Sequence, residues 1–234
     1  MADDVSHDEN ESLSVSWNDV TRFIRQLSHD LRNNLNAIEL QSAYIAELAT
    51  SEDLKTDIKS LREMVASLAL SLQKLAKSVG EVSPNPIPYR ALDLVQDLRS
   101  KIQRDLAQES REISWKIQLG DEMLNVDPQL LEEAFIEIFS NAFQHGRGKG
   151  PLVATAGNEN NRFVFTIREP KVQFALSTEN WGREPLRRTS HRHYGLGLHR
   201  AGEIMAAHGG ALHAKYDGNV STLISTLTLP LSGP

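Results

Sequence analysis

The sequence predicts an α+β protein in which a long α-helical hairpin is followed by an α/β sandwich. Apolar residues recur in steps of three and four through residues 20–79, which is the spacing of amphipathic helices. A cluster of prolines then interrupts this pattern, and helix-like and strand-like segments alternate as far as the C-terminus. Hydrophobic residues make up 40% of the 234 residues, which is enough to bury a core.

The composition excludes several classes of function. The chain has no cysteine, so disulfides, thiolate zinc sites and a cysteine nucleophile are ruled out. A net charge of −6 argues against broad nucleic-acid binding, and no apolar run approaches the roughly 20 residues needed to cross a bilayer. Residues 1–16 are acidic and polar, and we expect a disordered tail rather than a signal peptide. These features predict a cytoplasmic protein that binds neither nucleic acid nor membrane.

Residues 17–82 are expected to form the hairpin. The first helical pattern covers Val20–Leu48, and the second, Leu54–Val79, alternates steps of four and three as in a heptad repeat. Between them, Thr50 and Asp53 are spaced as a capping box that would start the second helix. Helices of about thirty residues are ~45 Å long, and a hairpin of that length cannot bury both apolar seams alone. We therefore expect a homodimer in which two hairpins form a four-helix bundle, although the periodicity alone also fits a structural coiled coil.

A second domain, residues 89–234, follows a proline-rich linker at residues 83–88. Three prolines within five residues stop the helix and stiffen the chain. The segments beyond the linker predict a mixed sheet layered with helices, one of which has Asp127 as its cap. The expected helices are Ala91–Ala107, Pro128–Gln144 and Gly197–Ala207, and the expected strands are Ile113–Leu119, Leu152–Ala156, Arg162–Ile167, Ala211–Tyr216 and Thr222–Leu229.

One histidine of the first helix is a candidate for chemistry. His29 falls outside the apolar seam, with Asp30 beside it and Asn33 one helical turn further along the same face. A solvent-exposed imidazole is largely neutral at neutral pH, and a neighbouring carboxylate can hold one ring nitrogen and take its proton while the other attacks. Taken alone, the same residues also fit a solvated helix histidine with a charged neighbour.

The stretch SHDLRNNL, Ser28–Leu35, resembles the phosphoacceptor box of sensor histidine kinases. A helical hairpin before an α/β domain is also the order of this family, whose members join a dimerisation and histidine-phosphotransfer domain to a GHKL-type ATPase domain. The resemblance covers the chain from about Trp17. It implies that His29 is the phosphoacceptor, that Asp30 is its base, and that Asn33 positions water when such a protein dephosphorylates a regulator. The implied partners are a second copy of the chain and the receiver domain of a response regulator.

Two segments of the second domain resemble the nucleotide site of the same family. The expected helix at residues 128–144 resembles the asparagine box, which implies that Glu137 and Asn141 lie at the phosphates of ATP and that Asn141 binds Mg²⁺. Gly195 and Gly197 precede a helix as in the second glycine box, where backbone amides approach phosphate.

The first glycine box of the family is missing. In the family, an aspartate that hydrogen-bonds the adenine amino group is followed by two glycines; here Glu169 stands at the aspartate position, and Lys171 and Gln173 replace the glycines. Side chains at these positions are expected to obstruct the base, and a lost base hydrogen bond costs roughly 1–3 kcal/mol. Together these changes predict ATP binding weakened by about tenfold to several thousandfold. Residues 181–193 resemble the mobile lid that covers ATP.

The sequence therefore predicts a two-component signal-transduction protein that passes a phosphoryl group through His29 to or from an aspartate of a receiver domain. The altered glycine box favours a phosphotransferase with impaired ATP binding. Two alternatives remain open: an ATP-dependent histidine autokinase with an atypical nucleotide pocket, and a non-catalytic dimeric interaction module. The expected cofactors are ATP and Mg²⁺ if the nucleotide site is functional, and otherwise Mg²⁺ on the partner receiver domain.

Overall fold

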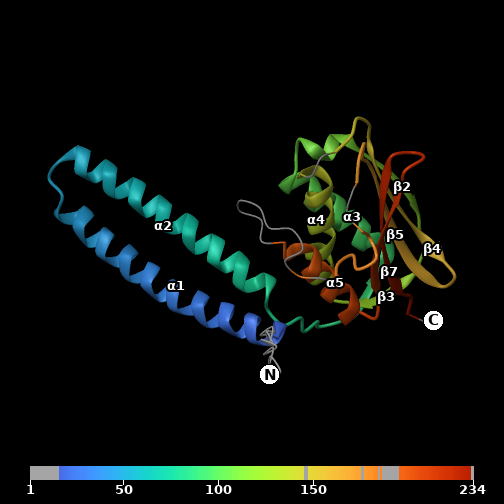
Figure 1. Cartoon of the computed structure of the whole chain (residues 1–234), viewed down its shortest axis with the longest axis horizontal. Coiled ribbons are helices and arrows are strands. Elements are labelled where there is room, and N and C mark those ends of the chain that lie inside the picture. The colour runs from blue at the N-terminus through green and yellow to red at the C-terminus, as the bar shows by residue number, and fades with distance from the viewer. Residues whose placement is uncertain (1–15, 145–146, 175–176, 184, 186–194, 233–234) are drawn as a thin grey trace, which may run out of the picture. The chain divides into compact units, whose positions relative to one another are not determined.

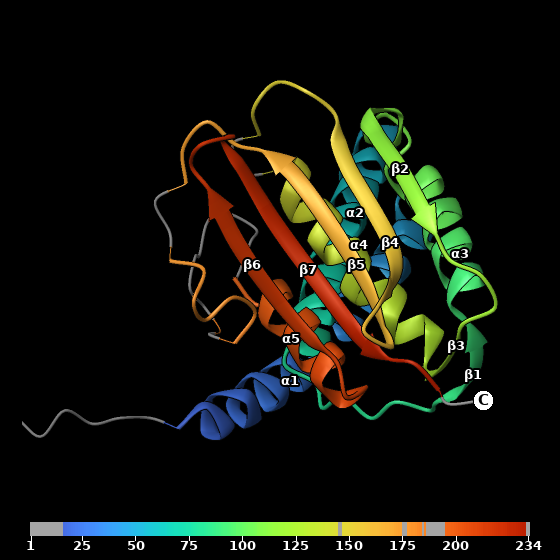
Figure 2. The ribbon, with the colours of Figure 1, turned by 90° about the vertical axis from the view of Figure 1, so that its right-hand side faces the viewer.

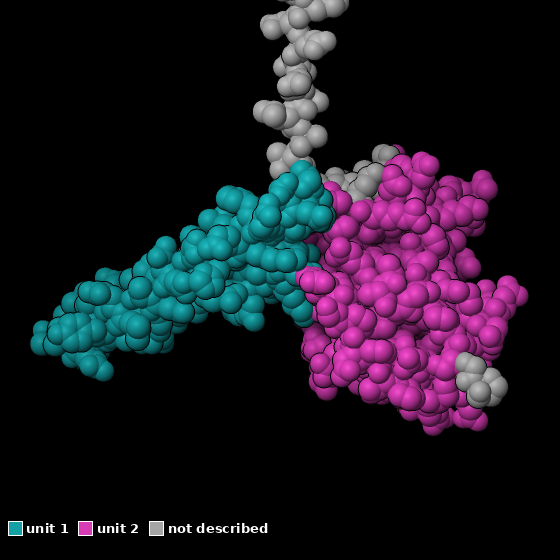
Figure 3. Space-filling view, turned by 90° about the horizontal axis from the view of Figure 1, so that it is seen from below, with its two compact units in different colours: residues 1–80 teal, residues 81–234 magenta. Residues whose placement is uncertain are grey.

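The computed structural model describes residues 16–144, 147–174, 177–183, 185 and 195–232. Its helices and strands make an α+β protein, as the sequence predicts (Figure 1). The chain divides into two compact units, residues 1–80 and residues 81–234, which are coloured separately in Figure 3. Within the described part of the chain, no helix is long and apolar enough to span a membrane.

Unit 1 is a hairpin of two α-helices, α1 (Trp17–Leu48) and α2 (Glu52–Ser78). The predicted capping box of Thr50 and Asp53 is wrong. The N-cap of α2 is Ser51, so Thr50 lies before the cap and Asp53 lies only two residues after it, whereas a capping box needs three. Among the described residues, α2 therefore starts without a side-chain capping bond.

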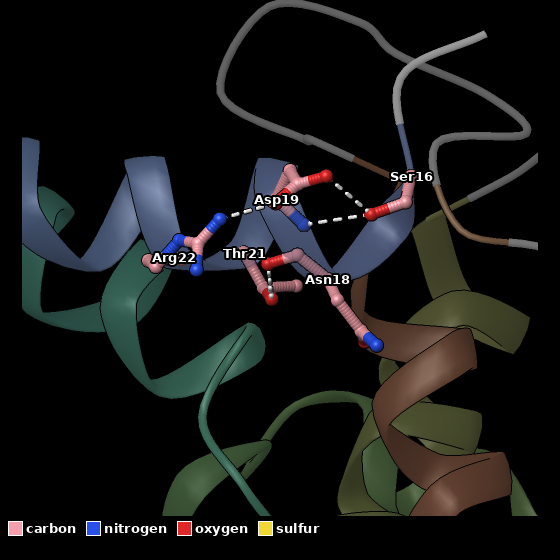
Figure 4. Close-up of polar contacts among 5 residues, drawn as sticks. All are labelled: Ser16, Asn18, Asp19, Thr21 and Arg22. Atoms are coloured by element: carbon pink, nitrogen blue, oxygen red, sulfur yellow. Dashed lines mark hydrogen bonds and ion pairs between the residues drawn. The ribbon is translucent and has the colours of Figure 1, made fainter.

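The first helix begins at a capped serine. Ser16 Oγ accepts a hydrogen bond from the Asp19 backbone N–H at 3.2 Å and donates to Asp19 Oδ2 at 2.7 Å (Figure 4). The Asp19 carboxylate also pairs with Arg22, three residues on. Ser16 is the last residue of the predicted disordered tail, and residues 1–15 of that tail lie outside the described residues.

The buried residues of α1 and α2 are two serines, an isoleucine and a valine. Ser28 and Ser42, the buried residues of α1, are 2% and 3% exposed, and Ile58 and Val65 of α2 are each 7% exposed. Small residues let two helices approach closely, but they remove little apolar area from water. Most of the apolar surface of the hairpin therefore lies elsewhere.

A row of larger apolar side chains faces outward beside this contact. These eight residues are 37% to 57% exposed and are called the apolar face of the hairpin. They are Leu27, Leu31, Ile38 and Ile45 of α1 and Leu54, Leu61, Met64 and Leu68 of α2. All except Met64 belong to the predicted seams, so a single hairpin leaves much of its seams exposed.

Unit 2 is a five-stranded mixed sheet, and Figure 2 shows its helices packed behind the strands. The strand order is β2-β4-β5-β7-β6; β2 and β4 are parallel, and the other neighbours are antiparallel. The strands are β2 (Ile113–Gln118), β4 (Leu152–Glu159), β5 (Arg162–Pro170), β6 (Ala211–Asp217) and β7 (Thr222–Pro230), and the helices are α3 (Ala91–Asp105), α4 (Pro128–Gln144) and α5 (Gly197–Ala207). The expected mixed α/β arrangement is confirmed. Each of these helices and strands starts at the expected residue and ends within three residues of the expected end.

The core of unit 2 lies between the helices and the sheet. Its largest fully buried side chains include Phe135 and Phe139 of α4 and Phe163 and Phe165 of β5. The rings of Phe135 and Phe165 meet edge to face, with their centroids 4.8 Å apart. Because alternate residues of a strand point to the same face, the alternating burial along β5 directs these phenylalanines towards α4.

A two-stranded antiparallel sheet of β1 (Ile87–Arg90) and β3 (Met123–Val126) was not expected from the sequence. β1 begins inside the expected linker at residues 83–88. Pro88 has no backbone N–H, and prolines also precede it, so the segment carries a weak strand signal. Its strand conformation depends on pairing with β3, which lies far along the chain.

Asp127 fixes the start of α4 and holds the segment before β1. Its Oδ1 accepts from the backbone N–H groups of Gln129 and Leu130 at 3.1 and 3.2 Å, and its Oδ2 accepts from that of Asn85 at 3.1 Å. Burial acts to raise the pKa of Asp127, but these N–H bonds outweigh burial and hold the pKa below its ordinary value.

We expect Asp127→Ala to lower the free energy of unfolding by about 1–2 kcal/mol at neutral pH, because the cap is lost. Since its pKa is lowered in the folded state, Asp127 stabilises the fold above the ordinary pKa of about 3.9, and this contribution disappears as the pH falls through the lower folded value. The difference between wild type and variant should therefore shrink below about pH 4. Urea denaturation followed by tryptophan fluorescence measures it, with Asp121→Ala, whose side chain is 97% exposed, as the control. Equal losses in both variants would contradict the assignment.

Candidate functional site

His29 lies on the outward side of α1. Its side chain is 67% exposed, whereas the preceding Ser28 is buried within the hairpin. Because successive residues of an α-helix point about 100° apart, the burial of Ser28 turns His29 away from the helix–helix contact. The imidazole is therefore open to a partner molecule.

Asp30 holds the His29 ring through one of its two nitrogens. Asp30 Oδ1 lies 3.2 Å from His29 Nδ1, and Gln26 Nε2 donates to the two Asp30 oxygens at 3.0 and 3.2 Å. The hydrogen bond with His29, and then that with Gln26, lowers the pKa of Asp30 below its ordinary value. Asp30 is therefore an ionised carboxylate beside the ring. Sequence reasoning missed Gln26, although its i, i+4 spacing to Asp30 was a usable signal.

Asn33 is the third member of this group and is also exposed. Its Nδ2 lies 3.5 Å from His29 Nδ1, at the outer limit of a hydrogen bond. Among the described residues, both side-chain contacts of the ring are therefore made at Nδ1. Nε2 is the nitrogen that these contacts leave for chemistry.

Glu137 and Asn141 share one face of α4, as their spacing predicts. Asn141 Nδ2 donates to Glu137 Oε1 at 3.1 Å. The Glu137 carboxylate reaches across to the first residue of α5, because a Cβ added to Gly197 would overlap it. The structure thus brings Glu137, Asn141 and Gly197 together in one cluster.

Gly195 and Gly197 have separate backbone roles at the start of α5. Gly195 has φ +67°, a left-handed conformation that residues with a side chain adopt only with strain. Gly197 is the first residue of α5, where free N–H groups and the helix dipole attract anions. Gly195 therefore allows the turn into the helix, and Gly197 admits the Glu137 carboxylate beside it.

Glu169 lies near the end of β5 and is buried together with Lys171; the two residues are 4% and 6% exposed. They form an ion pair between Lys171 Nζ and Glu169 Oε1. Burial is the main influence on Glu169 and raises its pKa, while the Lys171 ammonium and the Arg147 guanidinium oppose this rise. Sequence reasoning missed the pair, although residues two apart in a strand share a face.

Aromatic rings lie around Lys171. Its Nζ is 6.0 Å from the centroid of the Phe174 ring, within range of a cation–π contact. The Phe174 centroid is in turn 5.7 Å from those of Trp181 and Tyr216. Gln173, in contrast, is exposed. Of the two side chains that replace glycines, Lys171 alone occupies the interior, so the expected obstruction by Gln173 is not supported.

The two ends of the expected nucleotide site differ in their fit to ATP. At the phosphate end, the Asn141 amide and the start of α5 are groups that suit phosphate, although the Glu137 carboxylate beside Gly197 opposes an anion there. At the base end, the Glu169 carboxylate is buried and paired with Lys171 rather than open to an adenine amino group. The base end therefore does not fit ATP as the described residues are arranged.

The first residues of the segment expected to form a mobile lid are held against α5. The Arg183 carbonyl oxygen lies 3.0 Å from His199 Nδ1. A Cβ on Gly202 would overlap the Gly182 carbonyl group, so the two backbones are in direct contact. Residues 186–193 of the expected lid, with their arginines and histidines, lie outside the described residues.

His208 joins α5 to α4, a role that sequence reasoning missed. Its Nδ1 lies 2.7 Å from the Ile204 carbonyl oxygen, and its Nε2 accepts from the Asp127 backbone N–H at 3.0 Å. A neutral imidazole with its proton on Nδ1 satisfies both bonds. His208 and Asp127 are 81 residues apart, and no local pattern connects them.

Comparison with known proteins finds similarity to a sensory kinase. The chain is 24% identical over 216 residues to the adaptive-response sensory kinase SasA of Prochlorococcus marinus strain MIT 9301, and the alignment covers 89% of this chain and 58% of SasA. The chain thus spans little more than half the length of this relative. No protein-family model matches the chain.

Two solved structures share the fold. ShkA, determined in complex with AMPPNP, is 17% identical with a TM-score of 0.68, and the match covers 92% of this chain and 46% of ShkA. The histidine kinase AdeS of Acinetobacter baumannii is 17% identical with a TM-score of 0.52, and the match covers 88% of this chain and 98% of AdeS. These matches show that the chain shares the fold of ShkA and AdeS. The chain is thus similar in sequence to a sensory kinase and in fold to a histidine kinase.

Proposed function

We propose that this chain is a histidine phosphotransferase that passes a phosphoryl group through His29 to or from an aspartate of a response regulator receiver domain. The observation that carries the proposal is an imidazole that is 67% exposed and held with its Nδ1 3.2 Å from the Asp30 carboxylate. An exposed and oriented imidazole can reach a reacting group on another protein, whereas a buried one cannot.

In the proposed step, the Nε2 lone pair of His29 attacks the phosphorus of the receiver's aspartyl phosphate. The N–P bond forms as the bond from phosphorus to the aspartate oxygen breaks, and the receiver's carboxylate leaves with the electron pair. The ring gains positive charge, which the ionised Asp30 stabilises through the hydrogen bond to Nδ1–H. A lowered pKa suits Asp30 to this stabilising role better than to that of a base. The reverse reaction passes the group to a second receiver.

The apolar face of the hairpin supports pairing of two chains. A second hairpin packed against this face, as in an antiparallel four-helix bundle, would remove its side chains from water. Burying the exposed half of a Leu or Ile gains roughly 1 kcal/mol, so the eight residues favour pairing by several kcal/mol per chain. His29 is not a member of this face, and pairing would leave it accessible.

A groove on the hairpin supports docking of a receiver domain. It has a volume of about 460 Å³ between α1 and α2 and is lined by apolar residues such as Ile58 and Val65 and by charged ones such as Arg62. Asn36, which lines the groove, is two helical turns along α1 from His29 and on the same face, roughly 10 Å away along the axis. A receiver helix seated in the groove would bring its aspartate towards His29.

The base end of unit 2 supports a phosphoryl donor other than ATP. The first glycine box is absent from the sequence, and the carboxylate at its first position is engaged by Lys171. In this proposal the phosphoryl group comes from one receiver and goes to another, and Mg²⁺ belongs to the partner receiver domain. Unit 2 then supplies no phosphoryl group to His29.

An ATP-dependent autokinase is the second candidate. Asn141 and the glycine-led start of α5 retain the form of a phosphate site, and they favour this function over a purely structural one. A non-catalytic dimeric module is the third candidate, and the apolar face alone would be sufficient for it.

Two labelling reactions distinguish these functions. The chain is incubated with labelled ATP and Mg²⁺, and separately with receiver domains phosphorylated by labelled acetyl phosphate. We expect acid-labile label on His29 from a phosphorylated receiver and none from ATP. Label from ATP would establish the autokinase and overturn the proposal, and absence of label from both donors would leave the interaction module.

We expect Asn33→Ala to reduce dephosphorylation of a phosphorylated receiver by about tenfold or more, while His29 remains able to accept the group. Asn33 lies one turn from His29, where its amide can orient water without taking part in the N–P bond. Phosphate release and label on His29 are measured in parallel, with Asn18→Ala, an exposed asparagine in the first turn of α1, as the control. Equal loss of both activities would show that Asn33 is structural.

A further inference from the structure

We propose that the chain's own Lys171 occupies the base end of the nucleotide pocket, with its ammonium taking the place at Glu169 that an adenine amino group would take. This inference rests on the proposed function, in which the phosphoryl donor is a receiver domain. It deepens that function by naming the residue that excludes the nucleotide.

The substitution is chemically matched. An adenine amino group and a lysine ammonium are both N–H donors, and a carboxylate accepts from either. Lys171 is only two residues from Glu169, so the ion pair forms with little entropy of loop closure. A nucleotide would have to displace a donor that is covalently part of the same segment.

The Lys171 backbone is anchored on both sides. Its N–H donates to the Ser221 carbonyl oxygen at 2.7 Å, and its own carbonyl oxygen accepts from Tyr216 Oη–H at 3.1 Å. Because its backbone is held, Lys171 cannot move away as a whole, and the residue is only 6% exposed. To make room for a nucleotide, the side chain would have to rotate and break its ion pair with Glu169. Separation would leave a buried carboxylate unpaired, which is strongly unfavourable.

The phosphate end shows a parallel arrangement. The Glu137 carboxylate lies against Gly197 at the start of α5, where the helix dipole favours an anion, and Asn141 donates to it. A carboxylate in this place repels the phosphates of a nucleotide. At the base end, the Lys171 ammonium is an N–H donor like the adenine amino group. At the phosphate end, the Glu137 carboxylate is an anion like a phosphate.

Isothermal titration calorimetry of the full chain with Mg-ADP tests the proposal. We expect Lys171→Ala, which frees the Glu169 carboxylate, to bind at least about tenfold more tightly than wild type. The double variant Glu169→Leu/Lys171→Ala opens similar space without an acceptor and should show no such gain. Lys149→Ala is the control for charge alone, because it removes an exposed lysine near the end of β5. The neighbouring Gly148 donates its N–H to the Pro170 carbonyl oxygen.

Two binding results would overturn the proposal. Wild-type affinity equal to that of Lys171→Ala would mean that the pocket is open, and equal gains in the single and double variants would mean that Lys171 acts only by its bulk. Circular dichroism checks that each variant is folded, because Lys171→Ala leaves a buried carboxylate unpaired.

A measurement on the wild type keeps the proposal testable if that variant does not fold. Side-chain NMR should show a slowly exchanging lysine ammonium signal that Glu169→Leu removes and that millimolar Mg-ADP leaves unshifted. A shift of this signal on adding Mg-ADP would overturn the proposal. Transfer from a receiver to His29 is measured without nucleotide, so a failure of this inference and a failure of the proposed function can be told apart.

Discussion

Replacement of His29 by glutamine is expected to reduce phosphoryl transfer from a receiver domain to the background of the labelling assay. Glutamine keeps a polar side chain on an exposed helix face, so the fold should not change, but its amide nitrogen is not a nucleophile. Acid-labile label on the chain after incubation with phosphorylated receivers is the measurement. Circular dichroism should show unchanged helix content.

The control for this loss is another exposed histidine. His213 lies on β6 and is exposed, and His213→Gln should retain full transfer. Asp30→Asn should slow transfer by about a hundredfold, because a neutral amide cannot stabilise the charge that develops on the His29 ring. Label that survives in His29→Gln would reveal another acceptor and contradict the proposed function.

The second large effect is expected on dimerisation, when charged residues are introduced on the apolar face of the hairpin. Leu31→Glu combined with Leu61→Glu puts a carboxylate on each helix where a second hairpin would pack. We expect a cost of at least about 4 kcal/mol per dimer, which is about a thousandfold in Kd. Sedimentation equilibrium should show a monomer for the double variant and a dimer for wild type. Helix content should also fall, because a lone hairpin leaves its seams in water.

Leu40→Glu is the matched control for this effect. Leu40 is 74% exposed and lies two residues after Ile38, so it points to the opposite side of α1 from the apolar face. The variant should remain dimeric with unchanged helix content. A wild-type chain that is monomeric at micromolar concentration would refute the pairing of hairpins itself.

Local spacing was sufficient to place the residues around His29. A helix repeats every 3.6 residues, so the face that each residue occupies follows from its number once the apolar seam is identified. His29 and Asn33 are accordingly exposed on α1, and Glu137 and Asn141 lie within a hydrogen bond on α4. The same reasoning failed for the cap of α2, because Thr50 and Ser51 are adjacent, either can cap a helix, and spacing alone does not choose between them.

Contacts between distant segments could not be predicted in this way. The strand that begins at Ile87 exists because it pairs with β3, and the link from His208 to the Asp127 backbone spans 81 residues. Such contacts are selected by the packing of the whole unit, and neither propensity nor periodicity encodes them. Their effect is to position α4 and α5, which carry the candidate phosphate end.

The sequence by itself determined the resemblance to sensor histidine kinases, the hairpin and the chemical group on its outer face, because these depend on motifs and on the geometry of single helices. Only the tertiary structure decided what becomes of the two side chains that replace glycines. Gln173 is in water, whereas Lys171 is drawn inward to Glu169. The physical reason is that the aromatic rings and backbone contacts around Lys171 come from segments far along the chain, and they create the buried site in which its ammonium needs a carboxylate.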